Sequence, residues 1–122
     1  MQLTEDRPET RYVLRAVAEA GITINDRTYA HSLIVSPDQL IEDWLHGADL
    51  QASDLEPALA LNPELILLGT GTRQRMPAPA VLAACLTRGV GIEAMDNAAA
   101  GRTFNVLAGE NRRVVAAFML PG

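Results

Sequence analysis

Residues 63–107 place the tightest limits on the fold, because strand-like apolar runs alternate there with helical segments. The predicted elements are a strand over 64–69, a helix over 77–89, a strand over 90–95 and a helix over 96–107. A strand, a helix and a second strand in this order are typical of a parallel pair joined by a crossover helix. The sequence therefore predicts an α/β fold.

Further strands precede and follow this unit. The spacing of apolar residues predicts strands over 12–18, 22–24, 28–35 and 114–120. Asn25 and Asp26 tolerate the backbone of a tight turn, so we expect a hairpin between the second and third of these strands. The last strand is apolar throughout, which is typical of a central strand covered on both faces.

Residues 39–46 fit two interpretations. Leu40, Ile41, Trp44 and Leu45 recur at helical spacing and favour a short helix, and the alternation of a strand fits poorly, although periodicity does not resolve helix from strand well in so short an apolar run.

A capping box predicts a further helix. Ser53 and Glu56 have the required spacing, so a helix is expected from Asp54 to about residue 61, ahead of a proline. Leu55 and Leu59 would face inward.

Composition limits the classes of function. The net charge of −5 argues against a nucleic-acid partner, which needs a basic face. The chain has no lysine, so neither a Schiff-base lysine nor a P-loop lysine is available. Its single cysteine, Cys85, forms no intrachain disulfide, and no apolar run reaches the ~20 residues of a membrane helix. We expect a cytoplasmic protein with a flexible arm over 1–10 and a single domain over 11–122.

The loop over 69–75 (GTGTRQR) is the first candidate site. It follows the carboxyl end of a predicted parallel strand, where ligands bind in open α/β sheets. Its two glycines would let the backbone approach an anion. The candidate ligand-binding residues are Gly69, Thr70, Gly71 and Arg73, with Arg75 as a further positive charge. The alternative is a tight turn with solvated arginines, since the loop matches neither GxGxxG nor the P-loop pattern.

The turn over 96–102 is the second candidate site. Right-handed crossovers place it on the same sheet edge as the glycine loop, so Asp96, Asn97 and Arg102 would line one crevice with that loop. The alternative is structural: Asp96 or Asn97 caps the following helix, and Arg102 is exposed.

No catalytic residue, metal site or cofactor is predicted. Cys85 lies on an apolar helical stripe and is expected to be a small buried residue. His31 and His46 come from separate segments and lack the spacing of a metal site. No serine lies in a GxSxG elbow. Trp44 is expected in the core or half-buried.

Six short segments carry a further pattern through their order and spacing. They are GITIN at 21–25 with Tyr29, SLIVSP at 32–37, Trp44, PELILLGTG at 63–71, GIEAM at 91–95 and AAGRTFNVL at 99–107. Together they resemble a small α/β domain family of unknown function. That family includes the mitochondrial respiratory complex I assembly factor number three and the adipogenesis-associated domain proteins of animals. The resemblance covers residues 11–120.

The resemblance implies a three-layer α/β fold with a mixed central sheet, flanking helices and an additional N-terminal β-hairpin. It also implies that Trp44 ends or follows a strand, which favours a strand over a helix in 39–46. The family has no established catalytic residues, so none is transferred. Its best-characterised branch acts through protein partners in assembling a membrane respiratory complex.

The sequence thus leads to two main hypotheses of function. The first is a bacterial, non-enzymatic protein-interaction or complex-assembly accessory domain with a protein partner. The alternative is a small-molecule or anion-binding domain, with or without enzymatic activity, that uses the 69–75 loop and the 96–102 turn. A purely structural subunit with a permanent partner is a third interpretation.

Overall fold

The computed structural model describes residues 11–44 and 49–121. Its strands are β1 (Leu14–Ala18), β2 (Gly21–Ile24), β3 (Arg27–Tyr29), β4 (Leu33–Val35), β5 (Leu40–Ile41), β6 (Leu65–Gly69), β7 (Gly91–Met95) and β8 (Val114–Phe118). Its helices are the 3₁₀ helix η2 (Ala52–Leu55), α1 (Glu56–Leu59), α2 (Pro79–Leu86) and α3 (Asn97–Gly109). The strands form a three-stranded sheet, β1-β2-β3, and a five-stranded sheet, β5-β4-β8-β6-β7.

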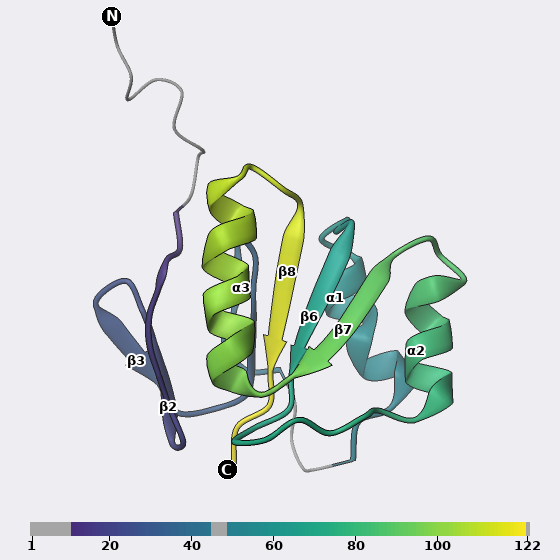
Figure 1. The fold of residues 1–122 in the computed structure, drawn as a ribbon, viewed down its shortest axis with the longest axis horizontal. Helices are drawn as coiled ribbons and strands as arrows, with labels where there is room; N and C mark the ends of the chain where they lie inside the picture. The colour runs from purple at the N-terminus through teal and green to yellow at the C-terminus, as the bar shows by residue number, and fades with distance from the viewer. Residues whose placement is uncertain (1–10, 45–48, 122) are drawn as a thin grey trace, which may run out of the picture.

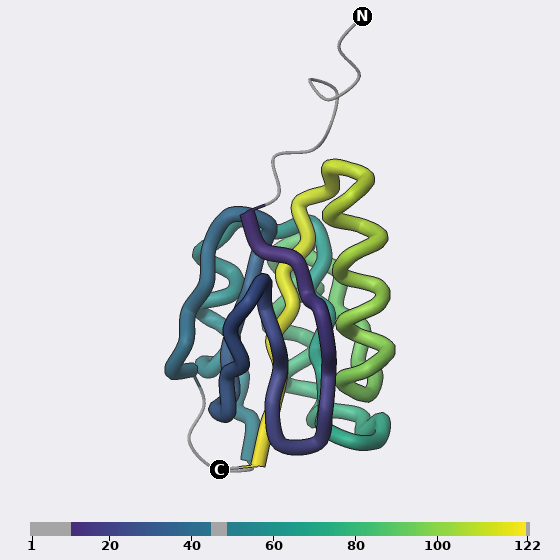
Figure 2. The backbone as a smooth tube through the Cα atoms, turned by 90° about the vertical axis from the view of Figure 1, so that its left-hand side faces the viewer, coloured from purple at the N-terminus to yellow at the C-terminus, as the bar shows by residue number. Residues whose placement is uncertain are grey.

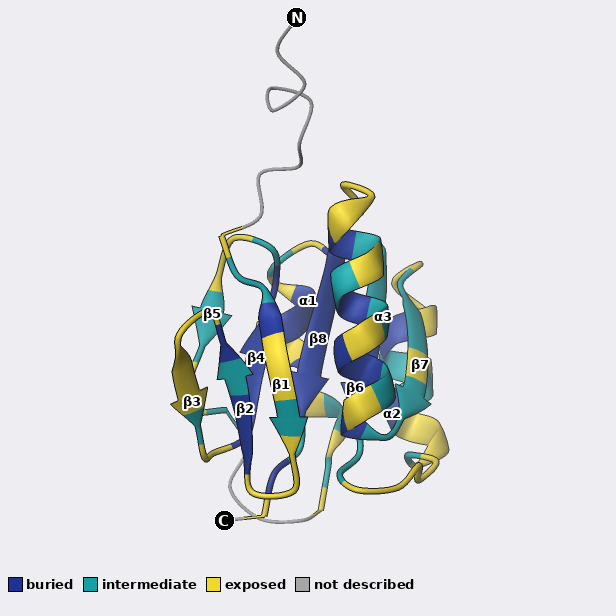
Figure 3. Cartoon of the chain, turned by 60° about the vertical axis from the view of Figure 1, so that its left-hand side comes forward, coloured by how far each residue is buried: buried dark blue, intermediate teal, exposed yellow. Residues whose placement is uncertain are grey.

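The elements stack in three layers around the five-stranded sheet (Figure 1). α3 and the three-stranded sheet pack on one face, while η2, α1 and α2 pack on the other. β8 lies in the middle and is buried along its whole length (Figure 3). The predicted three-layer α/β fold, with a mixed central sheet and an additional N-terminal hairpin, is confirmed.

The three central strands end at the same edge of the sheet, which we call the rim. β6 pairs in parallel with β7, Gly69 lying opposite Met95, and in parallel with β8, Gly69 lying opposite Phe118. β4 runs antiparallel to β8 and therefore begins at the rim. The predicted crossover from β6 through α2 to β7 is confirmed.

The sequence pattern of β8 follows from burial on both faces. Val114, Ala116 and Phe118 belong to the core beneath α3 and the three-stranded sheet. Val115 and Ala117 belong to the core on the opposite face, beneath α1 and α2. A strand covered on both faces has no solvent-facing positions, so it reads as a continuous apolar run.

The two crossovers pass over opposite faces of the sheet. The β6–α2–β7 crossover uses the face where Val81 and Cys85 of α2 are buried. The β7–α3–β8 crossover uses the other face, where Ala100 and Phe104 of α3 are buried, and it returns the chain past β6. The connections therefore diverge between β6 and β8, which makes that part of the rim a topological switch point.

The three-stranded sheet packs on α3 through β1, which runs beside that helix (Figure 2). The Asn105 side chain accepts a hydrogen bond from the Leu14 amide (3.0 Å) and donates one to the Leu14 carbonyl (2.7 Å). One turn earlier, Gly101 lets the strand approach, because a Cβ there would lie 3.0 Å from Cγ2 of Val17. The sheet is thus held by a paired amide contact and by close packing.

Glu64 joins the starts of β6 and β8 at the edge opposite the rim. Its carboxylate accepts hydrogen bonds from Nε of Arg112 (3.2 Å) and from the Arg113 amide (3.0 Å). The Arg112 bond, followed by the Arg113 amide, holds the pKa of Glu64 below its usual value. The pair is exposed, so its contribution to stability is small.

The strand predicted over 28–35 is wrong in its extent, because two strands occupy that segment. β3 pairs with β2 across the predicted turn at Asn25 and Asp26, whereas β4 joins the five-stranded sheet. Ser32 marks the change of sheet: it is buried, and its hydroxyl accepts a hydrogen bond from the Leu120 amide (2.8 Å). β3 is largely exposed and β4 is fully buried, a difference that periodicity along the chain does not reveal.

The helix favoured by spacing over 39–46 is wrong for the described part of that segment. Leu40 and Ile41 form β5, which pairs with β4, and Trp44 follows it, as the family resemblance implied. The Trp44 ring nitrogen donates a hydrogen bond to the Asp54 carbonyl (2.7 Å). Residues 45 and 46, like the predicted arm over 1–10, lie outside the described residues.

The predicted capping box at Ser53 is also wrong. The carboxylate of Asp54 accepts a hydrogen bond from the Gln51 amide (2.7 Å), so the first turn begins at Ala52 as the 3₁₀ helix η2. The expected burial of Leu55 and Leu59 is confirmed.

Replacement of Asn105 by alanine is expected to destabilise the protein by about 1–3 kcal/mol, because two hydrogen bonds to the β1 backbone are lost. Urea unfolding measures the change. Arg102→Ala on the same helix is the matched control, since Arg102 is exposed, and it should change stability by no more than about 0.5 kcal/mol. Equal stability of the two variants would contradict the proposed role of Asn105.

Candidate functional site

The two candidate turns lie side by side at the rim. The Thr70 amide donates a hydrogen bond to the Met95 carbonyl (2.9 Å), continuing the β6–β7 pairing beyond the strands. The Asn97 amide donates to the Gly71 carbonyl (2.8 Å), and the Gly71 amide donates back to Oδ1 of Asn97 (3.1 Å). The glycine loop and the turn before α3 therefore form one connected surface.

The Asn97 side chain also reaches the end of β8. It is 4% exposed, and its Nδ2 donates a hydrogen bond to the Met119 carbonyl (3.0 Å). One amide group thus links the segments that follow β6, β7 and β8. Gly69 is required beneath it, because a Cβ at this position would overlap Oδ1 of Asn97 and lie 2.9 Å from Cδ1 of Phe118. The Asn97 side chain therefore holds the rim together, and Gly69 leaves the space that this side chain occupies.

Asp96 caps α3, as the structural alternative for this turn expected. Its Oδ1 accepts a hydrogen bond from the Ala99 amide (2.7 Å). A small hollow of about 240 Å³ next to the cap is lined by Gly71, Asp96 and Asn97. Arg102 is exposed further along α3 and lines neither this hollow nor the larger one described below. The structure therefore does not bring Arg102 to the glycine loop.

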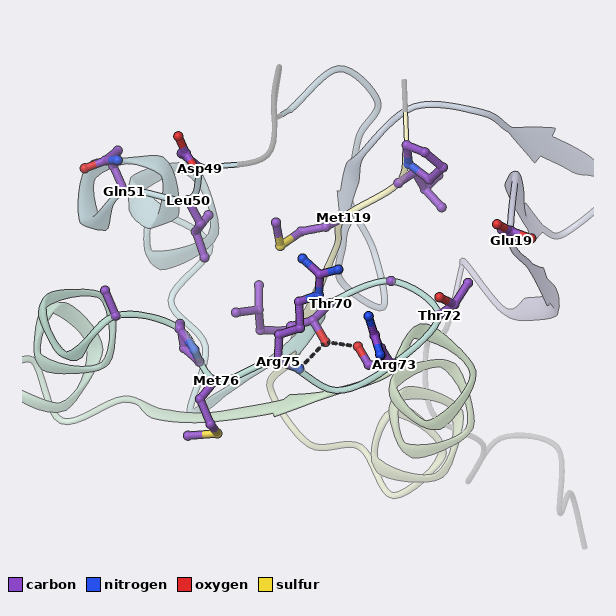
Figure 4. Close-up of a pocket in the computed structure, with 16 residues that line it drawn as sticks. Glu19, Asp49, Leu50, Gln51, Thr70, Thr72, Arg73, Arg75, Met76 and Met119 are labelled. Atoms are coloured by element: carbon purple, nitrogen blue, oxygen red, sulfur yellow. Dashed lines mark hydrogen bonds between the residues drawn. The ribbon is translucent and has the colours of Figure 1, made fainter.

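The glycine loop is closed by the side chain of Thr70 (Figure 4). Its hydroxyl donates a hydrogen bond to the Arg73 carbonyl (2.8 Å) and accepts one from the Arg75 amide (3.0 Å). Gln74 lies within this loop, and its Nε2 donates a hydrogen bond to the Ala94 carbonyl (2.8 Å) on β7. α2 begins only at Pro79, so its amino end does not face the loop in the way that a phosphate-binding helix would.

A hollow of about 900 Å³, which we call the rim hollow, lies over the switch point between β6 and β8. Leu68, Met119 and Leu120 line it at the strand ends. The rest of its lining comes from the segment before η2, the glycine loop and its continuation, the β1–β2 turn and the C-terminal segment. These residues are Asp49, Leu50 and Gln51; Thr70 to Arg73 and Arg75 to Ala78; Glu19; and Pro121.

Sequence reasoning missed part of this lining. Met119 lies near the end of the strand predicted over 114–120 and Pro121 follows that strand, so their position at the rim could have been inferred from the parallel order of the strands. Leu50 and Asp49 carry no such signal, because their place depends on how the chain returns from β5 to η2. Of the predicted residues, Thr70, Gly71 and Arg73 line the rim hollow, while Gly69 is buried beneath Asn97.

The remaining reactive side chains do not gather at the rim. Cys85 is fully buried, as predicted, and burial raises the pKa of its thiol, which disfavours the reactive thiolate. His31 is exposed, and His46 lies outside the described residues. Within 11–44 and 49–121, no three residues of the His, Cys, Asp and Glu types come together as a metal site would require.

Comparison with known protein families and sequences places this arrangement in context. A family model described as "Protein of unknown function (DUF498/DUF598)" matches residues 14–119. The chain is 32% identical over 117 residues to the "13 kDa major membrane protein" of Francisella tularensis subsp. holarctica (strain LVS), a match that covers 93% of this chain and 95% of that protein. It is 31% identical over 113 residues to "NADH dehydrogenase (ubiquinone) 1 alpha subcomplex assembly factor 3" of Danio rerio, covering 89% of this chain and 64% of that protein.

Solved structures share the same fold. An NMR structure from Xanthomonas campestris is 48% identical, with a TM-score of 0.81 over 98% of this chain and 92% of that one. A crystal structure from Bordetella parapertussis is 36% identical, with a TM-score of 0.84 over 92% of this chain and 98% of that one.

In the part of this chain that the structure describes, no helix is both long enough and apolar enough to cross a membrane.

Gly69→Ala is expected to destabilise the protein by about 1–3 kcal/mol, because the added methyl group meets Asn97 and Phe118. Asn97→Ala should cost a similar amount through lost hydrogen bonds. The double variant should be more stable than the sum of the two losses predicts, because truncating Asn97 removes one of the two obstacles to the methyl group. Urea unfolding of the four proteins measures this coupling.

Gly109→Ala is the control for this cycle, since a Cβ there meets nothing within 4 Å. It should leave stability unchanged or raise it slightly. If Gly69→Ala were no more costly than Gly109→Ala, or if the two rim substitutions were additive, the Asn97 contact would not hold the rim.

Proposed function

The chain belongs to the DUF498/DUF598 family of proteins of unknown function, and we propose that it is a non-enzymatic accessory domain that binds a protein partner during assembly of a larger complex. The observation that carries this proposal is the match of 89% of the chain to a protein named as an assembly factor for NADH dehydrogenase. The whole α/β domain is shared with that relative, so a partner-binding role residing in the domain would be shared with it.

The match also limits the proposal. The chain spans only 64% of the length of the Danio rerio relative, so the partners of that longer protein need not be the partners of this one. The described surface carries three large, exposed apolar side chains on separate elements. These are Met76 beside the rim hollow, Leu86 at the end of α2 and Val106 on α3. Single exposed apolar side chains are common on protein surfaces, so these three residues are positions at which to test for an interface, and they do not by themselves form an apolar patch.

Affinity purification of the tagged chain from its own host, expressed at its natural level, is expected to recover a stoichiometric partner that belongs to a multi-subunit complex. Lysis with and without detergent, followed by quantitative mass spectrometry, makes the measurement. A strain that expresses the tag alone is the control. Recovery of no stoichiometric partner under any of these conditions would count decisively against the proposal.

Single replacements of the three exposed apolar residues by serine locate the interface in the same experiment. All three lie on the surface, so folding should be preserved. We expect one replacement to release the partner and the other two to retain it.

Fractionation of the same cells checks the expected cytoplasmic location, which stays a prediction because the Francisella relative is named as a membrane protein.

A second function is favoured by one specific observation, the position of the rim hollow. Ligands in open α/β sheets bind outside the carboxyl ends of the strands, at the switch point where connections diverge to opposite faces. The rim hollow occupies that place, and its volume of about 900 Å³ lies within the usual range for small-molecule sites. Arg73 and Arg75 line it, which favours an anionic ligand.

Titration with acetate and, separately, with inorganic phosphate tests this second function through backbone amide NMR shifts. Saturable shifts in residues 69–75 are expected at millimolar concentrations of at least one of the two anions, and Arg73→Gln/Arg75→Gln should abolish them. Arg102→Gln is the matched control, because it removes an exposed arginine that lines neither hollow. The absence of shifts in 69–75 and in 96–102 with either anion would remove anion binding at the rim.

A further inference from the structure

The rim hollow has a charged part and an apolar part. Arg73 and Arg75 supply the charge, and both are exposed. Among the described residues, neither guanidinium takes part in an ion pair. The hydroxyl of Thr70 bonds to the Arg73 carbonyl and to the Arg75 amide, so the backbone that carries both arginines is held in place. The hollow therefore presents positive charge from a preformed turn.

The apolar part lies beside these arginines. Leu50, Met119 and Pro77 line it, and Met76 stands at its margin with 70% of its surface exposed. In Figure 4 the Arg75 side chain extends from the loop toward Met119. Methionine side chains adapt to apolar groups of varied shape. An apolar chain placed here would cover surface that is otherwise in contact with water.

Acidic residues on the walls restrict which anion fits. Glu19 and Asp49 line the hollow together with the two arginines, so its formal charges cancel. These carboxylates repel every negative charge that a ligand carries, so they disfavour a polyvalent anion such as a nucleotide more than a single carboxylate. A single carboxylate can instead pair with the planar guanidinium groups at short range.

We propose that the rim hollow binds a small monocarboxylate that carries an apolar chain, with its carboxylate at Arg73 and Arg75 and its chain against Met76 and Met119. This inference rests on the second proposed function and names its ligand class. It goes beyond anion binding, because it requires the charged and the apolar parts of the hollow to contribute together.

Octanoate is the probe, compared with acetate, 1-octanol and inorganic phosphate by amide NMR titration of the full chain below micelle-forming concentrations. Octanoate should give saturable shifts at the loop over 70–76 and at Met119, with an affinity roughly tenfold or more above those of acetate and octanol. Arg73→Gln/Arg75→Gln should lower octanoate affinity by roughly tenfold. Met76→Ser should weaken octanoate but leave acetate unchanged, and Arg102→Gln should affect neither.

The outcomes separate this inference from the function on which it rests. If acetate or phosphate binds at the loop as tightly as octanoate, the second proposed function is supported, but the inference of an apolar monocarboxylate is overturned. If octanol binds as tightly as octanoate, or if the arginine variant keeps full affinity for octanoate, the carboxylate is not recognised and the inference is likewise overturned. If none of the four probes shifts the loop, both the inference and the second proposed function fail.

Discussion

The amide group of Asn97 is the contact on which the rim depends. Three chain segments arrive there from parallel strands, and each brings backbone groups that the sheet itself no longer pairs. Asn97 supplies a donor to Met119 and an acceptor to Gly71 from a nearly buried position. A buried polar group is costly unless its hydrogen bonds are made, so the same contact that joins the segments also fixes their positions. Gly69 leaves the space that this contact needs.

Above this hydrogen-bonded rim lies the open surface of the rim hollow. Helices on opposite faces of the sheet leave the strand ends uncovered between β6 and β8, and the glycine loop and the segment before η2 form walls around that opening. Loops on a rigid scaffold are common positions for binding residues. The two proposed functions are compatible, because a ligand seated in the hollow would change the surface that Met76 presents to a protein partner.

The sequence predicted those features that depend on the local order of elements. The crossover, the burial of β8 and the meeting of the two turns follow from apolar runs, glycines and the parallel order of strands. Other features depend on contacts between distant segments. Ser32 divides the expected 28–35 strand through a bond to Leu120. Asn97 reaches Met119, although its position suggested either a ligand contact or a helix cap. Arg102 is exposed on α3 and lines neither hollow at the rim.

The hydrogen-bonded state of the Asn97 side chain tests the central claim most directly. Proton NMR of the folded chain, with selective labelling of asparagine, measures solvent exchange and nuclear Overhauser contacts of its amide protons. The account predicts slow exchange for the Nδ2 proton that faces Met119, and contacts from that amide to residues 69–71 and 118–119. Rapid exchange, together with the absence of those contacts, would show that the three strand ends are not joined as described.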